Sequence, residues 1–137
     1  MIIMTCLDDN GAMMFNKRRQ SQDRILRQRI LTQTAGSKLW MNSYSAKQFE
    51  GEIAENMAID EDFMDKAQPG DFCFIENSSP AAYEEKIEQI IVYKWNRKYP
   101  GDFYFDVSLE EHGWKCKETE EFVGHSHEKI TKEVYEK

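Results

Sequence analysis

The sequence is poor in the residues that build cross-linked or metal-stabilised proteins. Its 137 residues include three cysteines, Cys6, Cys73 and Cys116, and three histidines. No pair of cysteines has the Cys-x-x-Cys spacing, which excludes a zinc ribbon and a thioredoxin-like motif. Because each cysteine lies in an apolar run, we expect three reduced, half-buried strand thiols and, from their reduced state, a cytoplasmic location.

Long apolar runs are missing too. No stretch approaches the length needed to cross a membrane, and the apolar start of the chain lacks the basic flank and the length of a signal peptide. We therefore expect a soluble protein that is not exported and has no membrane partner. Internal repeats, low-complexity tracts and linkers are also absent, so a single domain over residues 1–137 is the simplest organisation.

The sequence does contain enough apolar residues for a core, together with an uneven charge. Apolar residues make up 40% and aromatic residues 12% of the chain, which excludes a disordered protein. Residues 1–50 carry a balance of +4, whereas residues 51–137 carry −11. One stretch is strongly basic and contains Lys17, Arg18, Arg19, Arg24, Arg27 and Arg29. It is either a solvated helix face or a patch that attracts a small anionic ligand, and a nucleic acid is not expected as a partner.

Apolar and β-branched runs predict strands along the whole chain. They cover residues 1–7, 37–42, 72–76, 87–95, 103–105, 114–122 and 128–135. Short helices are predicted from Ser43 or Ser45 through Phe49, after Asp60, and at Pro80. Residues 12–16 are expected to form a loop, and residues 50–58 show no clear pattern.

The longest predicted helix covers residues 22–34. Ser21 is its expected N-cap, because a serine hydroxyl can accept a hydrogen bond from an early backbone N–H. Gly36 would end it by adopting a left-handed conformation. Leu26 and Ile30 are among the residues expected to face the core.

This order of elements predicts an α/β fold with a mostly parallel central sheet and an antiparallel C-terminal hairpin. Phrases along nearly the whole chain also resemble dihydrofolate reductase, in the same order. The first strand and residues 8–16 resemble that family's opening strand and mobile loop, and residues 39–45 resemble its V-I-M-G-R-x-T turn. Residues 72–83 and 90–106 resemble its later strands. The resemblance implies the three-layer dihydrofolate reductase-like fold.

The same resemblance implies a set of site residues. Asp23 resembles the carboxylate that assists proton delivery to the pterin ring; buried beside a ligand, it would have a raised pKa and act as the acid. The alternative is an aspartate that favours the helix dipole from the first turn. The implied ligand-binding residues are Phe15, Asn16, Lys17, Arg18, Arg19, Arg27 and Tyr93. The implied cofactor-binding residues are Asn42, Ser43, Tyr44, Ser45, Asn77, Ser78 and Tyr83.

The cofactor site departs from the family pattern. The family uses a Gly-Gly turn so that the backbone can approach the cofactor pyrophosphate, whereas residues 76–78 here are Glu, Asn and Ser. Glu76 would repel a phosphate. The arginine of the family's other phosphate turn is missing from residues 42–45. NADPH is therefore possible as a cofactor but not expected, and the cofactor stays unassigned.

The chain also resembles short bacterial proteins that are often labelled ribonuclease Z. That activity needs a His-x-His-x-Asp-His motif and further histidines to hold two zinc ions. Here His125 and His127 are followed by Glu-Lys, so the Asp-His half is missing. On a strand these two histidines would share one face and could bind zinc with Cys116 or Glu128. A solvated hairpin is the simpler interpretation, and we expect no metal.

Two functions compete at this point. The favoured one is a divergent dihydrofolate reductase-like protein without normal NADPH-dependent activity, which binds a small anionic ligand or partner in a cleft rimmed by Lys17, Arg18 and Arg19. The alternative is an NAD(P)H-dependent reductase of a pterin-like substrate, with Asp23 as acid. A cleft closed by Glu76 and Tyr44 would favour the first. The sequence specifies neither the oligomeric state nor whether the chain is an enzyme, and nuclease activity ranks last.

Overall fold

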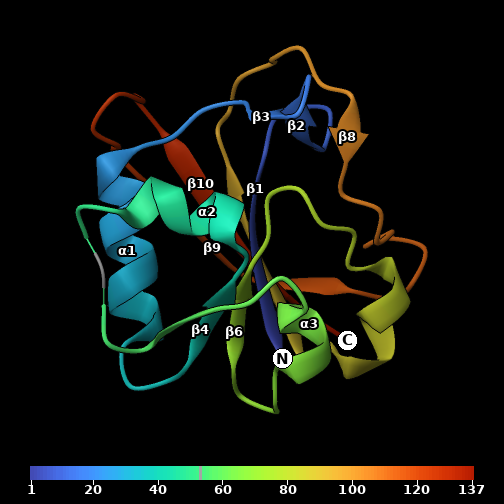
Figure 1. The fold of residues 1–137 in the computed structure, drawn as a ribbon. Helices are drawn as coiled ribbons and strands as arrows, with labels where there is room; N and C mark the ends of the chain where they lie inside the picture. Colours follow the sequence, from blue (N-terminus) through green and yellow to red (C-terminus); the bar gives the residue numbers. More distant parts are fainter. Residues whose placement is uncertain (53) are drawn as a thin grey trace.

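The computed structural model describes residues 1–52 and 54–137, and its main feature is a seven-stranded sheet (Figure 1). The strand order is β5-β4-β6-β1-β7-β10-β9. All pairs from β5 to β7 are parallel, and β10 runs antiparallel to both of its neighbours. The bounds are β1 Ile2–Leu7, β4 Leu39–Met41, β5 Met57–Ile59, β6 Phe72–Phe74, β7 Gln89–Lys94, β9 Lys115–Phe122 and β10 Ile130–Glu136. The predicted fold class is confirmed.

Strand β1 lies at the centre of this sheet. Ile3 pairs with Cys73 on one side and with Ile90 on the other, and all three residues are fully buried. A strand covered on both faces reads as a continuous apolar run, which is why residues 1–7 were predictable as a strand. The carboxyl ends of β1 and β6 lie at one edge of the sheet, and the candidate site lies there.

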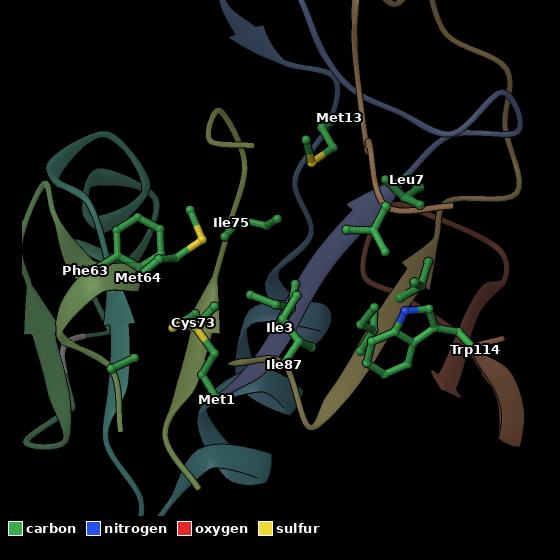
Figure 2. Packing of buried hydrophobic residues seen from close by; sticks show 14 of the residues in the cluster. Met1, Ile3, Leu7, Met13, Phe63, Met64, Cys73, Ile75, Ile87 and Trp114 are labelled. Carbon is green, nitrogen blue, oxygen red and sulfur yellow. Dashed lines mark hydrogen bonds between the residues drawn. The ribbon is translucent and has the colours of Figure 1, made fainter. Parts of the chain in front are cut away.

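Helices cover both faces of the sheet. Helix α1 (Arg24–Thr34) and the 3-10 turn η1 (Lys47–Phe49) pack on one face, where Leu26, Ile30 and Phe49 join one apolar cluster. Helix α3 (Phe63–Lys66) and η2 (Ala81–Lys86) lie on the other face. Figure 2 shows the apolar cluster on that second face, where Phe63 and Trp114 pack with residues of the central strands.

A second, three-stranded sheet lies above the carboxyl end of β1 (Figure 1). It contains β3 (Arg18–Arg19), β2 (Ala12–Phe15) and β8 (Phe103–Tyr104). The prediction of a loop over residues 12–16 was wrong. Asn16 and Lys17 both have positive φ, 51° and 62°, so they form a two-residue hairpin turn that pairs β2 with β3. Strand β8 completes this sheet from about 90 residues later in the chain.

Three predicted helix starts need correction. Helix α1 begins at Arg24, and its N-cap is Asp23 rather than Ser21. Helix α2 (Ser43–Ala46) is capped by the side chain of Asn42, which accepts a hydrogen bond from the Ser45 N–H, so neither predicted serine is the cap. Asp23 and Asn42 each lie two or three residues before the free N–H groups at the start of the helix. Their side-chain oxygens are therefore better placed to accept these hydrogen bonds than the predicted serines. The side chain of Asp60 bonds the Asp62 N–H instead of capping α3.

The segment without a clear sequence pattern contributes an edge strand. Strand β5 pairs with β4, with Met57 opposite Leu39. Asn56 fixes its start, because its side-chain amide donates to the backbone oxygens of Thr34 and Ser37 at 2.9 and 2.7 Å. A three-residue strand held by one asparagine leaves little periodicity in the sequence.

The cysteines differ in exposure. Cys73 is buried and Cys6 is half-buried, but Cys116 is exposed, which corrects the expectation of three half-buried thiols. The reason is that Cys116 lies on β9, an edge strand whose residues are all exposed except Phe122. Among the described residues, no helix is long and apolar enough to cross a bilayer.

Candidate functional site

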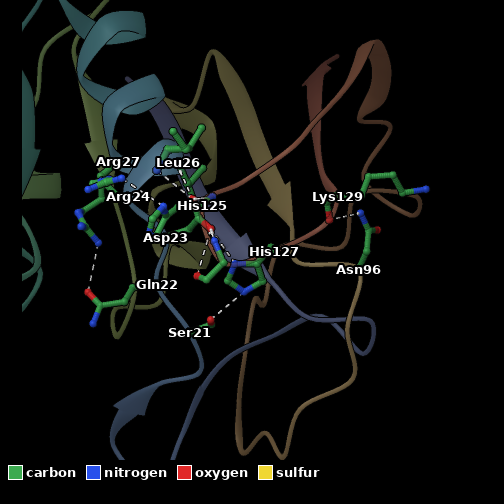
Figure 3. A network of polar contacts seen from close by, with 12 residues as sticks. Ser21, Gln22, Asp23, Arg24, Leu26, Arg27, Asn96, His125, His127 and Lys129 are labelled. Atoms are coloured by element: carbon green, nitrogen blue, oxygen red, sulfur yellow. Dashed lines mark hydrogen bonds and ion pairs between the residues drawn. The ribbon is translucent and has the colours of Figure 1, made fainter.

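The candidate site begins with Asp23, which is 2% exposed and links two distant segments of the chain. Its carboxylate caps α1 by accepting hydrogen bonds from the backbone N–H groups of Ile25 and Leu26, at 2.9 and 3.2 Å. The same carboxylate accepts backbone N–H bonds from His125 and Ser126, both at 2.9 Å (Figure 3). Asp23 therefore holds the loop between β9 and β10 against the start of α1.

The loop approaches Asp23 very closely. The Gly124 N–H donates to the His127 carbonyl at 2.9 Å, which makes a tight turn. A Cβ atom added to Gly124 would lie 2.6 Å from Oδ2 of Asp23 and 2.9 Å from Ile130. Only glycine fits here, because any side chain would separate the loop from the carboxylate.

His127 is the third component of the network. Its Nδ1 lies 2.9 Å from Oδ2 of Asp23, and its Nε2 lies 2.9 Å from Oγ of Ser21. The ring is buried and stacks on Trp95, with centroids 4.5 Å apart and an interplanar angle of 27°. The Tyr99 hydroxyl lies 3.4 Å from the same Nε2. The imidazole is therefore held at both nitrogens and on one face.

The electrostatics of Asp23 are opposite to the expectation for a general acid. Burial raises its pKa, but the hydrogen bonds from His125, His127, Ser126 and Leu26 outweigh burial and hold the pKa well below its usual range. Asp23 is thus ionised at neutral pH. The helix-cap alternative describes its local contacts, and the expected rise in pKa is not found.

The two loop histidines do not share one face of a strand. They lie in the turn between β9 and β10, where His127 is buried and His125 is exposed with its Nδ1 3.2 Å from the Arg24 guanidinium. No group of three or more potential metal ligands is found among the described residues.

A second buried carboxylate, Glu76, lies at the end of β6. Arg19 binds it through two nitrogens, with Nε at 2.9 Å and Nη2 at 3.1 Å from the carboxylate oxygens. The Gln48 amide adds a third hydrogen bond at 3.0 Å. The Arg19 guanidinium also lies 4.6 Å from the centre of the Tyr44 ring, and the Tyr44 hydroxyl accepts the Arg19 N–H at 2.9 Å. The structure thus closes this edge with Arg19, Tyr44, Gln48 and Glu76, which we call the Arg19–Glu76 cluster.

The Arg19–Glu76 cluster also influences a thiol. Cys6, on β1, has a pKa raised well above its usual value, first by burial and second by the negative charge of Glu76. The thiol therefore stays protonated at neutral pH and is a poor nucleophile.

The predicted cofactor residues are only partly brought together. Asn42 and Asn77 meet across β4 and β6, with an amide hydrogen bond of 2.8 Å. Tyr44 lies in the Arg19–Glu76 cluster, and Ser45 is the buried residue of α2. Ser43 is exposed and Ser78 is half-buried near this edge. Tyr83 lies elsewhere, on η2, where its hydroxyl donates to Asp65 at 2.9 Å.

The predicted ligand residues also divide into two groups. Asn16 and Lys17 line a cavity of about 450 Å³ with Met14, Asn77, Asp102 and Phe103, which we call the hairpin cavity. Phe15 and Arg18 are exposed on the same hairpin. Arg27 lies on α1 and pairs with Glu52 at 3.5 Å. Tyr93 is 1% exposed and packs edge-to-face on Phe122, where burial raises its pKa.

Sequence reasoning missed how Ser21 and His127 would meet. They are 106 positions apart, and no spacing in the sequence indicates the contact. Ser21 was assigned to the helix cap and His127 to a solvated hairpin. The predicted C-terminal hairpin accounts for the loop itself, but the pairing of β10 with β7, which was not predicted, brings that loop to the start of α1.

A nicotinamide dinucleotide does not fit the residues at the end of β6. A buried carboxylate occupies the position that the resemblance assigns to a phosphate-binding turn, and Arg19 is already neutralised by it. A phosphate placed there would meet Glu76 without a free cation from the Arg19–Glu76 cluster.

The comparisons with known proteins support the fold and add no sequence-level relative. No protein-family model and no curated protein matches the sequence. A solved structure of dihydrofolate reductase from Enterococcus faecalis, complexed with NADP(H) and RAB-propyl, matches with a TM-score of 0.67. The match covers 98% of this chain and 94% of that one, at 10% identity. The chain therefore has a dihydrofolate reductase-like fold, and at this identity the likeness extends to the fold alone.

Proposed function

We propose that this chain is a divergent dihydrofolate reductase-like protein without normal NADPH-dependent activity, and that it binds a small anionic ligand at the hairpin cavity. The observation that carries the first part is the two-nitrogen contact between Arg19 and Glu76. Because of this contact, a carboxylate paired with Arg19 occupies the place where a reductase of this fold would need space and positive charge for the cofactor phosphates.

The state of Asp23 supports the same proposal. A general acid must hold a proton near neutral pH. Asp23 instead has a lowered pKa and all of its oxygens engaged by N–H donors of the chain. It would have to exchange these hydrogen bonds for a ligand before it could deliver a proton to one.

The hairpin cavity supports the second part of the proposal. Lys17 lines it, and Arg18 is exposed on the same hairpin. The cavity also contains Asp102, whose carboxylate accepts the Asn16 N–H at 2.9 Å. The lining itself has one cation, Lys17, and one carboxylate, Asp102, and the exposed Arg18 adds a second positive charge on the same hairpin. This local positive charge on an acidic chain favours a small anion over a polyanion.

The first test is a titration of the purified protein with NADPH, followed by tryptophan fluorescence and thermal unfolding. We expect no saturable change up to millimolar cofactor. Saturable binding in the micromolar range, which corresponds to about −8 kcal/mol, would contradict the proposal. In that case pterin reduction by the wild type and by Asp23→Asn would decide whether the alternative, an NAD(P)H-dependent reductase, is correct.

The ligand part is tested with inorganic pyrophosphate as the probe, by calorimetry and thermal shift. We expect saturable binding that weakens about tenfold in Lys17→Ala, equivalent to about 1.4 kcal/mol. The matched control is Lys117→Ala, because it removes the same charge from an exposed position on β9. Equal weakening in both variants would mean that only net charge matters, and it would contradict a site at the hairpin cavity.

A further inference from the structure

We propose that Ser21, His127 and Asp23 form a nucleophilic triad, with Ser21 as the nucleophile for small carboxylic esters or thioesters. The three residues are linked in the order that such chemistry requires. Asp23 contacts Nδ1 of His127 at 2.9 Å, and Nε2 of the same ring contacts the Ser21 hydroxyl at 2.9 Å (Figure 3). Base and nucleophile are within hydrogen-bond reach, and a third group orients the base.

The protonation pattern of the triad follows from its contacts. The Asp23 carboxylate is ionised and can only accept, so Nδ1 of His127 carries the hydrogen and donates it. In the neutral ring Nε2 then has a free lone pair and accepts the Ser21 hydroxyl proton in a hydrogen bond. This tautomer is the one in which His127 can act as a base toward Ser21.

Three features hold the base in place. Asp23 is 2% and His127 is 6% exposed, so water has little access to their contact. Trp95 covers one face of the imidazole. The backbone N–H bonds from His125 and Ser126 fix the Asp23 carboxylate on the side of the loop. Asp23 is therefore a positioning residue with little rotational freedom.

The nucleophile is more open than the base. Ser21 is half-buried, and its neighbours Gln22, His125 and Ser126 are exposed. The Tyr99 hydroxyl, 3.4 Å from Nε2, lies at the same edge of the ring and is the candidate donor for an oxyanion formed beside Ser21. A half-buried hydroxyl beside exposed residues suits a small acyl group whose leaving group extends into solvent.

The reaction balances without any cofactor. The Ser21 Oγ–H proton passes to Nε2 of His127 while Oγ bonds to the carbonyl carbon and the π electron pair moves to the oxygen. Collapse of the tetrahedral intermediate breaks the bond to the leaving group, which takes the proton from Nε2. Water then repeats the two steps on the acyl-serine, releasing the carboxylic acid and restoring Ser21.

The experiment is covalent labelling with a fluorophosphonate, in which Oγ displaces fluoride from phosphorus, followed by intact-mass and peptide analysis. We expect one adduct per chain, located on Ser21 and absent from Ser21→Ala. Hydrolysis of p-nitrophenyl acetate should show an initial burst of one p-nitrophenolate per chain in the wild type and none in Ser21→Ala. No Ser21 adduct on the folded wild-type protein would overturn the proposal.

The dependence of the Ser21 labelling rate on His127 distinguishes a reactive triad from a hydrogen bond that only stabilises the fold. In His127→Gln, with folding checked by thermal unfolding, labelling of Ser21 should slow by about 100-fold or more. The control is Ser37→Ala, because Ser37 lies beyond the opposite end of α1 and should leave the rate unchanged. Labelling of folded His127→Gln at the wild-type rate would overturn the proposal. If that variant does not fold, His127→Asn replaces it, and labelling of folded His127→Asn at the wild-type rate would equally overturn the proposal.

Discussion

Two of the buried carboxylates, Asp23 and Glu76, are satisfied in different ways. Asp23 accepts four backbone N–H groups, whose positions are fixed by the start of α1 and by the loop before β10. Glu76 is bound only by side chains, those of Arg19 and Gln48. Fixing a backbone N–H group costs little side-chain entropy, whereas an arginine or glutamine side chain loses much conformational entropy when it is fixed in one rotamer. The contacts of Asp23 are thus fixed by the backbone, whereas rotamer changes can break the side-chain contacts of the Arg19–Glu76 cluster.

We expect the largest loss of stability when the Asp23 carboxylate is removed. Asp23→Ala removes a helix cap and leaves two loop N–H groups and His127 without their acceptor, so we expect unfolding free energy to fall by about 3 kcal/mol or more. Urea unfolding measures it. Asn42→Ala, which removes the cap of α2, should cost about 1 kcal/mol. Equal losses in the two variants would show that the loop contacts contribute nothing.

A smaller effect is expected at the other carboxylate. Glu76→Ala leaves the Arg19 guanidinium largely buried without a counter-charge, and we expect a loss of about 2 kcal/mol. The control is Glu121→Ala, because its pair with Lys129 at 3.2 Å is exposed on both sides and should change stability by less than about 0.5 kcal/mol. If the two variants were equally stable, the Arg19–Glu76 contact would be no more than a surface ion pair.

The lowered pKa of Asp23 should show in how steeply stability changes with pH in acid. The folded pKa of Asp23 lies below the unfolded value of about 3.9. Its stabilising contribution is therefore complete above about pH 4 and is lost as pH falls toward the folded pKa. In Asp23→Asn the loss of stability between about pH 4 and 2 should be shallower by up to 1.4 kcal/mol per pH unit, roughly one proton's worth. Unfolding titrations at several pH values measure this, and identical slopes would contradict the lowered pKa.

The sequence predicted the strands that form continuous apolar runs. Residues 1–7, 72–76 and 87–95 were identified as strands because both faces of these strands are buried. The β2–β3 hairpin and β5 were missed, since neither forms a continuous buried β-branched run and each depends on partners distant in the sequence.

The candidate site was predictable only in part, because its contacts also join residues that are distant in the sequence. Asp23 could be singled out by its resemblance and by its position in the first turn of a predicted helix. Its pKa could not, because the donors that lower it come from residues 125–127, more than 100 positions away. Glu76 was predicted to repel a phosphate, but its pairing with Arg19 required the β2–β3 hairpin that sequence reasoning treated as a loop.

The contact between Asp23 and the loop before β10 also has a consequence for the order of folding. A ribosome makes Asp23 about 100 residues before it makes His127. Until His127 has been made, Asp23 caps α1 but has no contact with the loop between β9 and β10. Strand β10 also cannot yet pair with β7 and β9. Contacts of such long sequence separation form late and limit the folding rate. The nascent chain must therefore expose one edge of β7 to its surroundings, including chaperones, until β10 has emerged.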